Sequence, residues 1–210
     1  MSSQFTGLNS QRDTISKQRF LEHLTTGNYI PFKLKSNAAL PVYQLYPIGP
    51  EASKSISSAI TYESMTSLKQ FMMEGKAFPD FDFTDLDGKR YTNASTRGKL
   101  LVVKTWFVNC QACIEEFPEL NAFVERHKAD DNIIFLSLAL DSKDEIHRLL
   151  EQKAFKYAVV SDQSHFIKDE LNLSIYPTHI IIDQMGKVVK VGNIASEMIS
   201  FFENEFQSAD

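Results

Sequence analysis

The sequence predicts an α/β protein whose main part is a three-layer α/β/α sandwich with a central mixed sheet. From residue 76 onward, short apolar runs alternate with helical patterns, and strands joined by right-handed crossover helices form a parallel sheet. Two glycine turns, at Asp87-Gly88 and Met185-Gly186, predict hairpins, whose strands pair antiparallel. Residues 1–75 lack this alternation, so we expect them to form an N-terminal extension and residues 76–210 the main domain.

Composition limits the possible classes of function. The chain has 210 residues, of which 43% are hydrophobic, enough for a core in one domain with an extension or in two small domains. A net charge of −5 without a lysine or arginine run argues against a nucleic-acid partner. The sequence has no transmembrane stretch, and its first ten residues have neither the basic start nor the apolar core of a signal peptide. We therefore expect either a cytosolic protein or one whose export segment lies outside this sequence.

The N-terminal extension carries no recognisable catalytic motif. Helix-like spacing predicts helices over residues 14–24 and 64–74. Between them, the alternating residues 30–35 and several prolines predict short strands or loops. We interpret the extension as an accessory segment that covers part of the main domain, with a partner-binding module as the alternative.

The elements expected in the main domain follow the apolar pattern. Pro118 lacks a backbone donor and should kink the helix that contains it. In chain order we expect a hairpin of residues 81–84 and 89–92, a strand over 100–105, a helix over 111–128, a strand over 133–140, a helix over 143–152, a strand over 157–160, a helix over 164–171, a hairpin of 178–183 and 188–191, and a closing helix over 195–206.

Both cysteines of the chain lie in one Cys-x-x-Cys motif, Cys110 and Cys113, shortly after the apolar run Leu100–Val103. If a strand delivers Cys110 to a helix that begins near Gln111, free backbone N–H groups and the helix dipole favour its thiolate. In such sites the pKa of the nucleophilic thiol falls to roughly 3.5–7.5, which makes it reactive near neutral pH. Cys113, three residues further on, can reach back and close a disulfide.

Two other interpretations of the motif are weaker. A structural zinc site needs four ligands, usually in two pairs, and the five histidines of this chain are scattered singly. A purely structural disulfide between residues three apart closes a very small loop and restricts the unfolded chain little. The motif therefore favours a redox-active pair.

The order of these elements resembles the thioredoxin fold over residues 76–206. The shared features are a strand, a Cys-x-x-Cys helix with a proline five residues after the second cysteine, and a Tyr-Pro-Thr sequence before a hairpin. The segment 77–81 and the insertion around 133–171 are similar to the TlpA/ResA-type thiol-disulfide oxidoreductases, with their AhpC/TSA-Redoxin-like domain. The resemblance implies that Cys110 is the attacking thiol, Cys113 the resolving thiol, and Pro177 a cis-proline against the active site.

The same resemblance gives roles to three more residues. It implies that Glu116 is an acidic residue near the sulfurs, which accepts or relays the proton of the resolving thiol. Trp106 matches an aromatic residue beneath the active-site loop, with a core role or a substrate contact. A cis Tyr176–Pro177 bond would turn the backbone of Tyr176 towards a substrate strand, so we predict Trp106, Tyr176 and Pro177 as substrate-binding residues.

Three departures from the family pattern bear on the chemistry. Asn109 stands before the first cysteine, and Gln111-Ala112 between the cysteines contains no proline, which leaves the direction of electron flow open. Lys104 occupies the place of a buried acid in thioredoxin. Because a buried ammonium is costly unless it is paired, Lys104 either reaches solvent or meets a carboxylate such as Glu116.

The function expected from this resemblance is thiol-disulfide exchange with protein dithiols and disulfides, driven by a second protein that supplies electrons. It implies no metal and no organic cofactor. The location would be the periplasm or cell envelope if an export segment, lipid or N-terminal anchor lies outside the sequence, and the cytoplasm otherwise.

Three alternatives remain. A peroxiredoxin-like peroxidase would need Pro-x-x-x-Thr-x-x-Cys, where this chain has Val103 and Phe107. A non-enzymatic scaffold could deliver metal or haem with the two soft sulfur ligands. In the third alternative, residues 1–75 carry the function and the redox domain regulates it.

Overall fold

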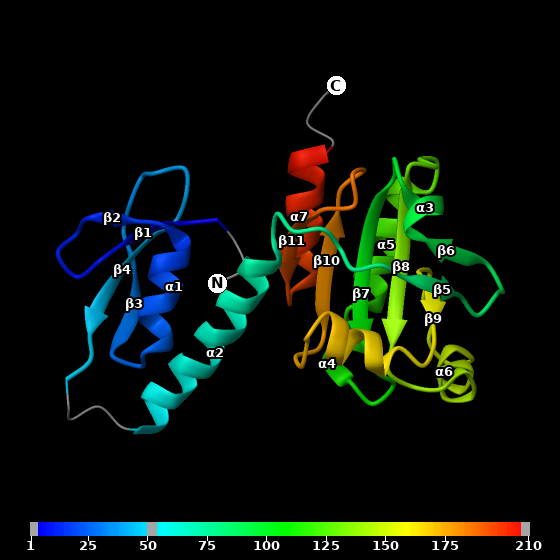
Figure 1. The fold of residues 1–210 in the computed structure, drawn as a ribbon, viewed down its shortest axis with the longest axis horizontal. Coiled ribbons are helices and arrows are strands. Elements are labelled where there is room, and N and C mark those ends of the chain that lie inside the picture. Colours follow the sequence, from blue (N-terminus) through cyan, green and yellow to red (C-terminus); the bar gives the residue numbers. More distant parts are fainter. Residues whose placement is uncertain (1–3, 50–53, 207–210) are drawn as a thin grey trace. The chain divides into compact units, whose positions relative to one another are not determined.

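The computed structural model describes residues 4–49 and 54–206 (Figure 1). The chain divides into two compact units, residues 1–73 and 74–210, where the sequence predicted a boundary between residues 75 and 76. The N-terminal unit has a sheet and a core of its own.

The N-terminal unit is a four-stranded sheet with two helices. Its strands follow the order β2-β1-β4-β3, in which β1 and β4 are parallel and the other pairs antiparallel. Phe5, Phe20, Leu24 and Leu45 form its buried core. The elements are β1 (Thr6–Leu8), β2 (Thr14–Ile15), α1 (Lys17–Thr25), β3 (Tyr29–Leu34), β4 (Val42–Pro47) and α2 (Lys54–Met73).

Both helices of this unit differ from the sequence prediction at their starts. Helix α1 begins at Lys17 rather than at residue 14, because the side chain of Ser16 accepts a hydrogen bond from Arg19 N at 3.3 Å and caps the helix. Helix α2 begins at Lys54, ten residues before the predicted start. Its first half is rich in serine and β-branched residues, whose low helix propensity concealed it.

The C-terminal unit is built on a five-stranded mixed sheet, as predicted. The order is β11-β10-β7-β8-β9, in which β7, β8 and β9 are parallel and β10 is antiparallel to β7 and β11. Central strand β7 is buried along its whole length. The strands are β7 (Leu100–Trp106), β8 (Ile133–Ala139), β9 (Ala158–Val160), β10 (Thr178–Ile182) and β11 (Val188–Gly192).

Helices and a hairpin complete this unit. Phe123 of α5 and Phe202 of α7 pack on the sheet face that carries Val102 and Ile181, in one buried cluster. Leu101 and Val103 alternate with Val102 along β7, so they point to the opposite face, and they are also buried. The elements are β5 (Asp82–Thr84), β6 (Arg90–Thr92), α3 (Asn93–Thr96), α4 (Gln111–Glu115), α5 (Phe117–His127), α6 (Lys143–Leu150), the π-helix η1 (Phe166–Glu170) and α7 (Ala195–Phe206).

The sequence predicted one helix over residues 111–128 with a kink at Pro118; the structure has two helices here, and the break between them positions one residue of the site. Helix α4 ends at Glu115, α5 begins at Phe117, and Pro118 lies in the first turn of α5, where a backbone N–H is not needed. Glu116 is therefore the single residue between two short helices.

Candidate active site

A disulfide joins Cys110 and Cys113 at the start of α4, with an S–S distance of 2.05 Å. Cys110 is the N-cap residue, and its Sγ accepts a hydrogen bond from the backbone N–H of Cys113 at 3.2 Å. The predicted position at a helix start is confirmed. Cys110 retains 7% of its surface and Cys113 none, so Cys110 presents the more accessible sulfur.

The loop that leads to Cys110 is held from below by Trp106 and Asp141. The indole Nε1 of Trp106 donates to Ser137 Oγ at 3.2 Å, and its ring packs edge-on against Phe117. A carboxylate oxygen of Asp141 accepts from Val108 N at 2.8 Å. Trp106 has no exposed surface, which corrects its prediction as a substrate-binding residue: it supports the loop from within the core.

The segment Ile175–Thr178 lies beside the cysteine loop. The Tyr176–Pro177 peptide bond is cis, as predicted. The ring of Tyr176 meets the ring of Phe107 edge-on, with centroids 5.5 Å apart, and Cys110 N donates to Phe107 O at 3.0 Å. Burial raises the pKa of the Tyr176 hydroxyl, which makes no hydrogen bond within the described residues. Phe107 thus connects Tyr176 to Cys110.

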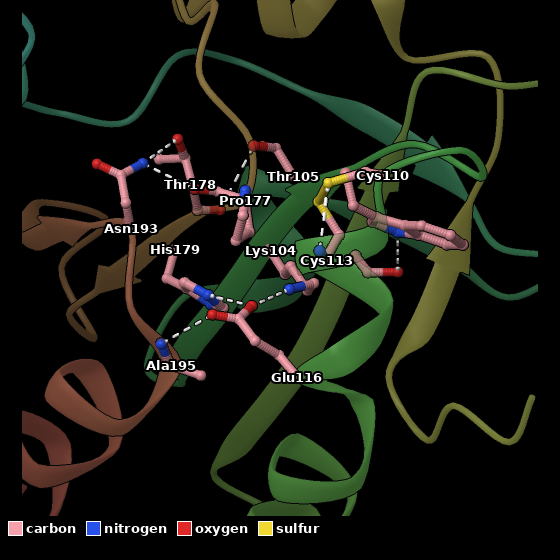
Figure 2. A network of polar contacts seen from close by, with 12 residues as sticks. Lys104, Thr105, Cys110, Cys113, Glu116, Pro177, Thr178, His179, Asn193 and Ala195 are labelled. Carbon is pink, nitrogen blue, oxygen red and sulfur yellow. Dashed lines mark hydrogen bonds and ion pairs between the residues drawn. A yellow bond between two sulfur atoms is a disulfide. The ribbon is translucent and has the colours of Figure 1, made fainter.

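A buried polar cluster lies one helical turn after Cys113. The carboxylate of Glu116 pairs with Lys104 Nζ through Oε2, which also lies 3.0 Å from His179 Nε2. Its other oxygen accepts from Ala195 N at 3.0 Å. Figure 2 shows the carboxylate between Lys104 and His179, with the disulfide beyond them. The alternative in which Lys104 meets Glu116 is therefore confirmed.

The fold explains why these groups meet. Lys104 of β7 and His179 of β10 are direct partners in the antiparallel register, so their side chains emerge next to each other on one sheet face. Glu116 approaches that face from the break between α4 and α5. His179 was not predicted as a site residue, because a single histidine in an apolar strand matches no motif. The sequence feature that could have revealed it is its place directly before Ile180, Ile181 and Ile182, where a polar side chain would be buried.

Burial and pairing act in opposite directions on these three groups. Burial lowers the pKa of Lys104 and of His179, and the nearby Glu116 carboxylate opposes both shifts. For Glu116, burial raises the pKa, but hydrogen bonds and charge from His179 and Lys104 lower it to about 2. Near neutral pH the cluster therefore holds an ionised Glu116 paired with Lys104 and a neutral His179.

Lowering the pH from 7 to 5 should decrease the free energy of unfolding, partly through His179. Because burial holds its pKa below 6.5, the unfolded chain binds a proton in this range that the folded protein does not, so stability is lost as pH falls. One such group contributes at most about 1.4 kcal/mol per pH unit. His179→Gln cannot take up this proton, and urea unfolding at pH 5, 6 and 7 should give a shallower slope.

His127 provides the control for this measurement. Its pKa is also lowered by burial, and it lies outside the cluster on α5. His127→Gln should reduce the slope without changing the contribution of His179. An unchanged slope in His179→Gln would contradict the neutral state assigned to that residue.

The described residues contain no group of three or more His, Cys, Asp and Glu side chains that could hold a metal ion. None of the helices in residues 4–49 and 54–206 has the length and apolarity needed to cross a membrane.

Beside the disulfide lies an open hollow of about 360 Å³, lined by Val108, Asn109, Gln111, Ile114, Glu115 and Lys153.

Comparison with known proteins agrees with this site. The model of the AhpC/TSA family matches residues 75–191, which is more than half of the chain and includes both cysteines. The chain belongs to the AhpC/TSA family. The match begins at residue 75, so nearly all of the N-terminal unit lies outside it.

Among its relatives, this AhpC/TSA-family chain is similar to the thiol-disulfide oxidoreductase ResA of Bacillus subtilis (strain 168), with 28% identity over 145 residues. That alignment covers 68% of this chain and 81% of the relative. A ResA of Geobacillus thermodenitrificans is 24% identical over 130 residues, which cover 62% of this chain and 75% of the relative. The chain is a TlpA/ResA-type thioredoxin-like protein and carries the cysteine pair of a thiol-disulfide oxidoreductase.

Solved structures share the fold. A thioredoxin domain of a thiol-disulfide oxidoreductase from Bacteroides vulgatus superposes with a TM-score of 0.56 at 23% identity, covering 62% of this chain and 96% of that domain. A putative thiol:disulfide interchange protein DsbE from Chlorobium tepidum gives 0.56 at 22% identity, covering 65% and 96%. The predicted thioredoxin-like architecture is confirmed.

Proposed function

We propose that this chain exchanges electrons between protein dithiols and protein disulfides through Cys110 and Cys113. The observation that carries the proposal is the asymmetry of the pair: Cys110 caps α4 and retains exposed surface, whereas Cys113 is fully buried. Two-step thiol-disulfide exchange needs an attacking cysteine that is more accessible than the resolving cysteine, and the small exposed fraction of Cys110 beside the fully buried Cys113 fits that order.

The reaction runs in two displacements. In the reduced protein, the Cys110 thiolate attacks one sulfur of a substrate disulfide, so that a bond between Cys110 and the substrate forms while the substrate S–S bond breaks and releases a thiolate. Cys113, after losing its proton, then attacks Cys110 and releases the second substrate sulfur. Two electrons have passed to the substrate, and the Cys110–Cys113 disulfide remains. A dithiol of a partner protein restores the reduced form by the reverse steps.

The surroundings of the sulfurs support this chemistry. The N–H of Cys113 donates to Cys110 Sγ, a contact that favours a thiolate over a thiol. Glu116 lies one turn after Cys113, and we propose that it relays the proton of that thiol. Because its pKa is about 2, the carboxylate does not retain a proton near neutral pH. The exposed 16% of its side chain offers a route for that proton to solvent.

Substrate contacts would come from two sides of Cys110. On one side, the segment with Tyr176 and Pro177 lies against Phe107 and offers backbone groups and an apolar surface. On the other side, the hollow next to α4 has an apolar wall of Val108 and Ile114. This arrangement suits an extended polypeptide that crosses the sulfur, and Trp106 would act only through the loop above it.

The partners are therefore a protein substrate and a protein reductant, and the electrons are held by the cysteine pair without a resident metal or organic cofactor. The TlpA/ResA-type relationship supports a place outside the cytoplasm, in the periplasm or cell envelope. Location of the native protein by cell fractionation would test that part separately.

Trapping with a resolving-site variant tests the proposed function. Cys113→Ser keeps the attacking thiol but cannot complete the second displacement. It should therefore accumulate mixed disulfides with protein substrates that contain a disulfide. These adducts should be visible on a non-reducing gel and should disappear when dithiothreitol is added. The wild-type chain should reduce insulin with dithiothreitol as electron donor. Absence of both results, or hydrogen peroxide consumption at a rate comparable to disulfide reduction, would contradict the proposal.

A further inference from the structure

Asn193 holds the segment Ile175–Thr178 from outside the redox motif. It lies between the end of β11 and the start of α7. Its side-chain amide Nδ2 donates to Pro177 O at 2.7 Å and to Thr178 Oγ1 at 3.0 Å. Figure 2 shows this amide directed at Pro177 and Thr178, on the far side of the segment from the sulfurs.

Thr178 extends this contact to the other end of the segment. Its hydroxyl accepts a hydrogen bond from Asn193 and donates one to Ile175 O at 2.7 Å. The Asn193 amide therefore holds Thr178 directly and Ile175 through the Thr178 hydroxyl, on both sides of the Tyr176–Pro177 dipeptide. Thr105 Oγ1 adds a longer bond to Thr178 O at 3.4 Å. Asn193 makes the shortest of the contacts that side chains outside the segment give to its backbone.

The segment needs such an anchor because its outward contacts with the cysteine loop are apolar. Tyr176 meets Phe107 through ring packing, and its hydroxyl adds no hydrogen bond within the described residues. A contact between aromatic rings is less directional than a hydrogen bond, so it fixes the position of the segment's backbone less tightly. The carbonyl of Pro177 and the hydroxyl of Thr178 therefore set where the dipeptide stands relative to Cys110.

We propose that Asn193 is a positioning residue, which places Tyr176 and Pro177 against Cys110 and thereby determines the affinity for protein substrates. This inference rests on the proposed function, since it gives the segment a polypeptide to bind. Asn193 acts through the segment and contacts neither sulfur. Its loss should therefore weaken binding of a long substrate much more than it slows the chemical step.

Asn193→Asp is the sharpest test. Aspartate has the same shape as asparagine but no donor, and its carboxylate would face the Pro177 carbonyl and the Thr178 oxygen. The KM for insulin should rise about tenfold, while kcat changes less than twofold, because both contacts of the amide are lost. The ratio of kcat/KM for insulin to that for hydroxyethyl disulfide, which is too small to span the segment, should fall by the same factor.

Asn121→Asp is the matched control. Asn121 also fastens a chain segment, since its amide donates to Ala154 O at 2.8 Å and its carbonyl accepts from Lys156 N at 2.8 Å, but it lies on α5 away from Ile175–Thr178. This variant loses a comparable contact and should leave the KM for insulin unchanged. An equal rise of KM in both variants, or no rise in Asn193→Asp, would overturn the inference.

Two further measurements distinguish a positioning role of Asn193 from a folding defect and from a failure of the proposed function. If Asn193→Asp does not fold, Asn193→Ala removes the donor without adding charge and should give the same selective rise in KM. Amide hydrogen exchange of Tyr176 and Thr178 needs no substrate and should be faster in the variant than in wild type. If wild type fails to reduce insulin, the proposed function is wrong, and unchanged exchange would show separately that Asn193 does not position the segment.

Discussion

Replacing Cys110 by serine is expected to reduce insulin turnover to the uncatalysed rate. The serine hydroxyl does not ionise near neutral pH and cannot form a mixed disulfide, and the buried Cys113 has no exposed surface through which to attack in its place. The measurement is insulin precipitation in the presence of dithiothreitol, with the rate of dithiothreitol alone subtracted.

The matched control is Cys113→Ser, which keeps the accessible sulfur. It should react once with an aromatic disulfide, releasing one equivalent of thiol, and then stop, whereas Cys110→Ser should release none. Insulin reduction by Cys110→Ser at the wild-type rate would show that the Cys110–Cys113 pair does not carry out the reaction.

Replacing Glu116 by glutamine is expected to lower the free energy of unfolding by about 3–5 kcal/mol, the typical result of removing one partner of a buried ion pair. Lys104 has no exposed surface, and Glu116 is the carboxylate that faces it. Without that charge, the ammonium must lose its proton or draw water into the core. Urea unfolding near neutral pH measures the loss, with the m value checked for two-state behaviour.

A double variant separates lost charge from lost packing. Lys104→Met combined with Glu116→Gln removes both charges and fills similar volume, so it should recover most of the stability lost by Glu116→Gln alone. Glu125→Gln, which breaks the exposed pair with Lys156, should leave the stability nearly unchanged. A double variant as unstable as the single one would show that the charge of Lys104 is not the cause.

The sequence predicted the parts of this structure that depend on local pattern. The strand before the cysteines, the helix break at Pro118 and the hairpin strands follow from apolar runs, a missing backbone donor and glycine turns. Lys104 was recognised as a residue in need of a partner, because a charge in an apolar strand is costly wherever the strand lies.

The parts that were missed depend on contacts between distant segments or on weak propensity. His179 and Asn193 are ordinary polar residues in the sequence, and only the pairing of β10 with β7 and β11 brings them to the site. The first half of α2 was missed because its serines favour turns, and no periodic stripe compensated for them. The resemblance left Trp106 with either a core role or a substrate contact, because a family position does not reveal how deeply a side chain is buried; the structure supports the core role.

The hydrogen bond from Ala195 to Glu116 couples the start of the last helix to the buried polar cluster near the cysteines. Ala195 is the first residue of the last helix, so the helix is attached to the active-site carboxylate by its own leading amide. Any event that unwinds this helix from its first turn takes one of the hydrogen-bond donors away from Glu116. The order of the first turn of this helix and the position of the Glu116 carboxylate therefore depend on each other.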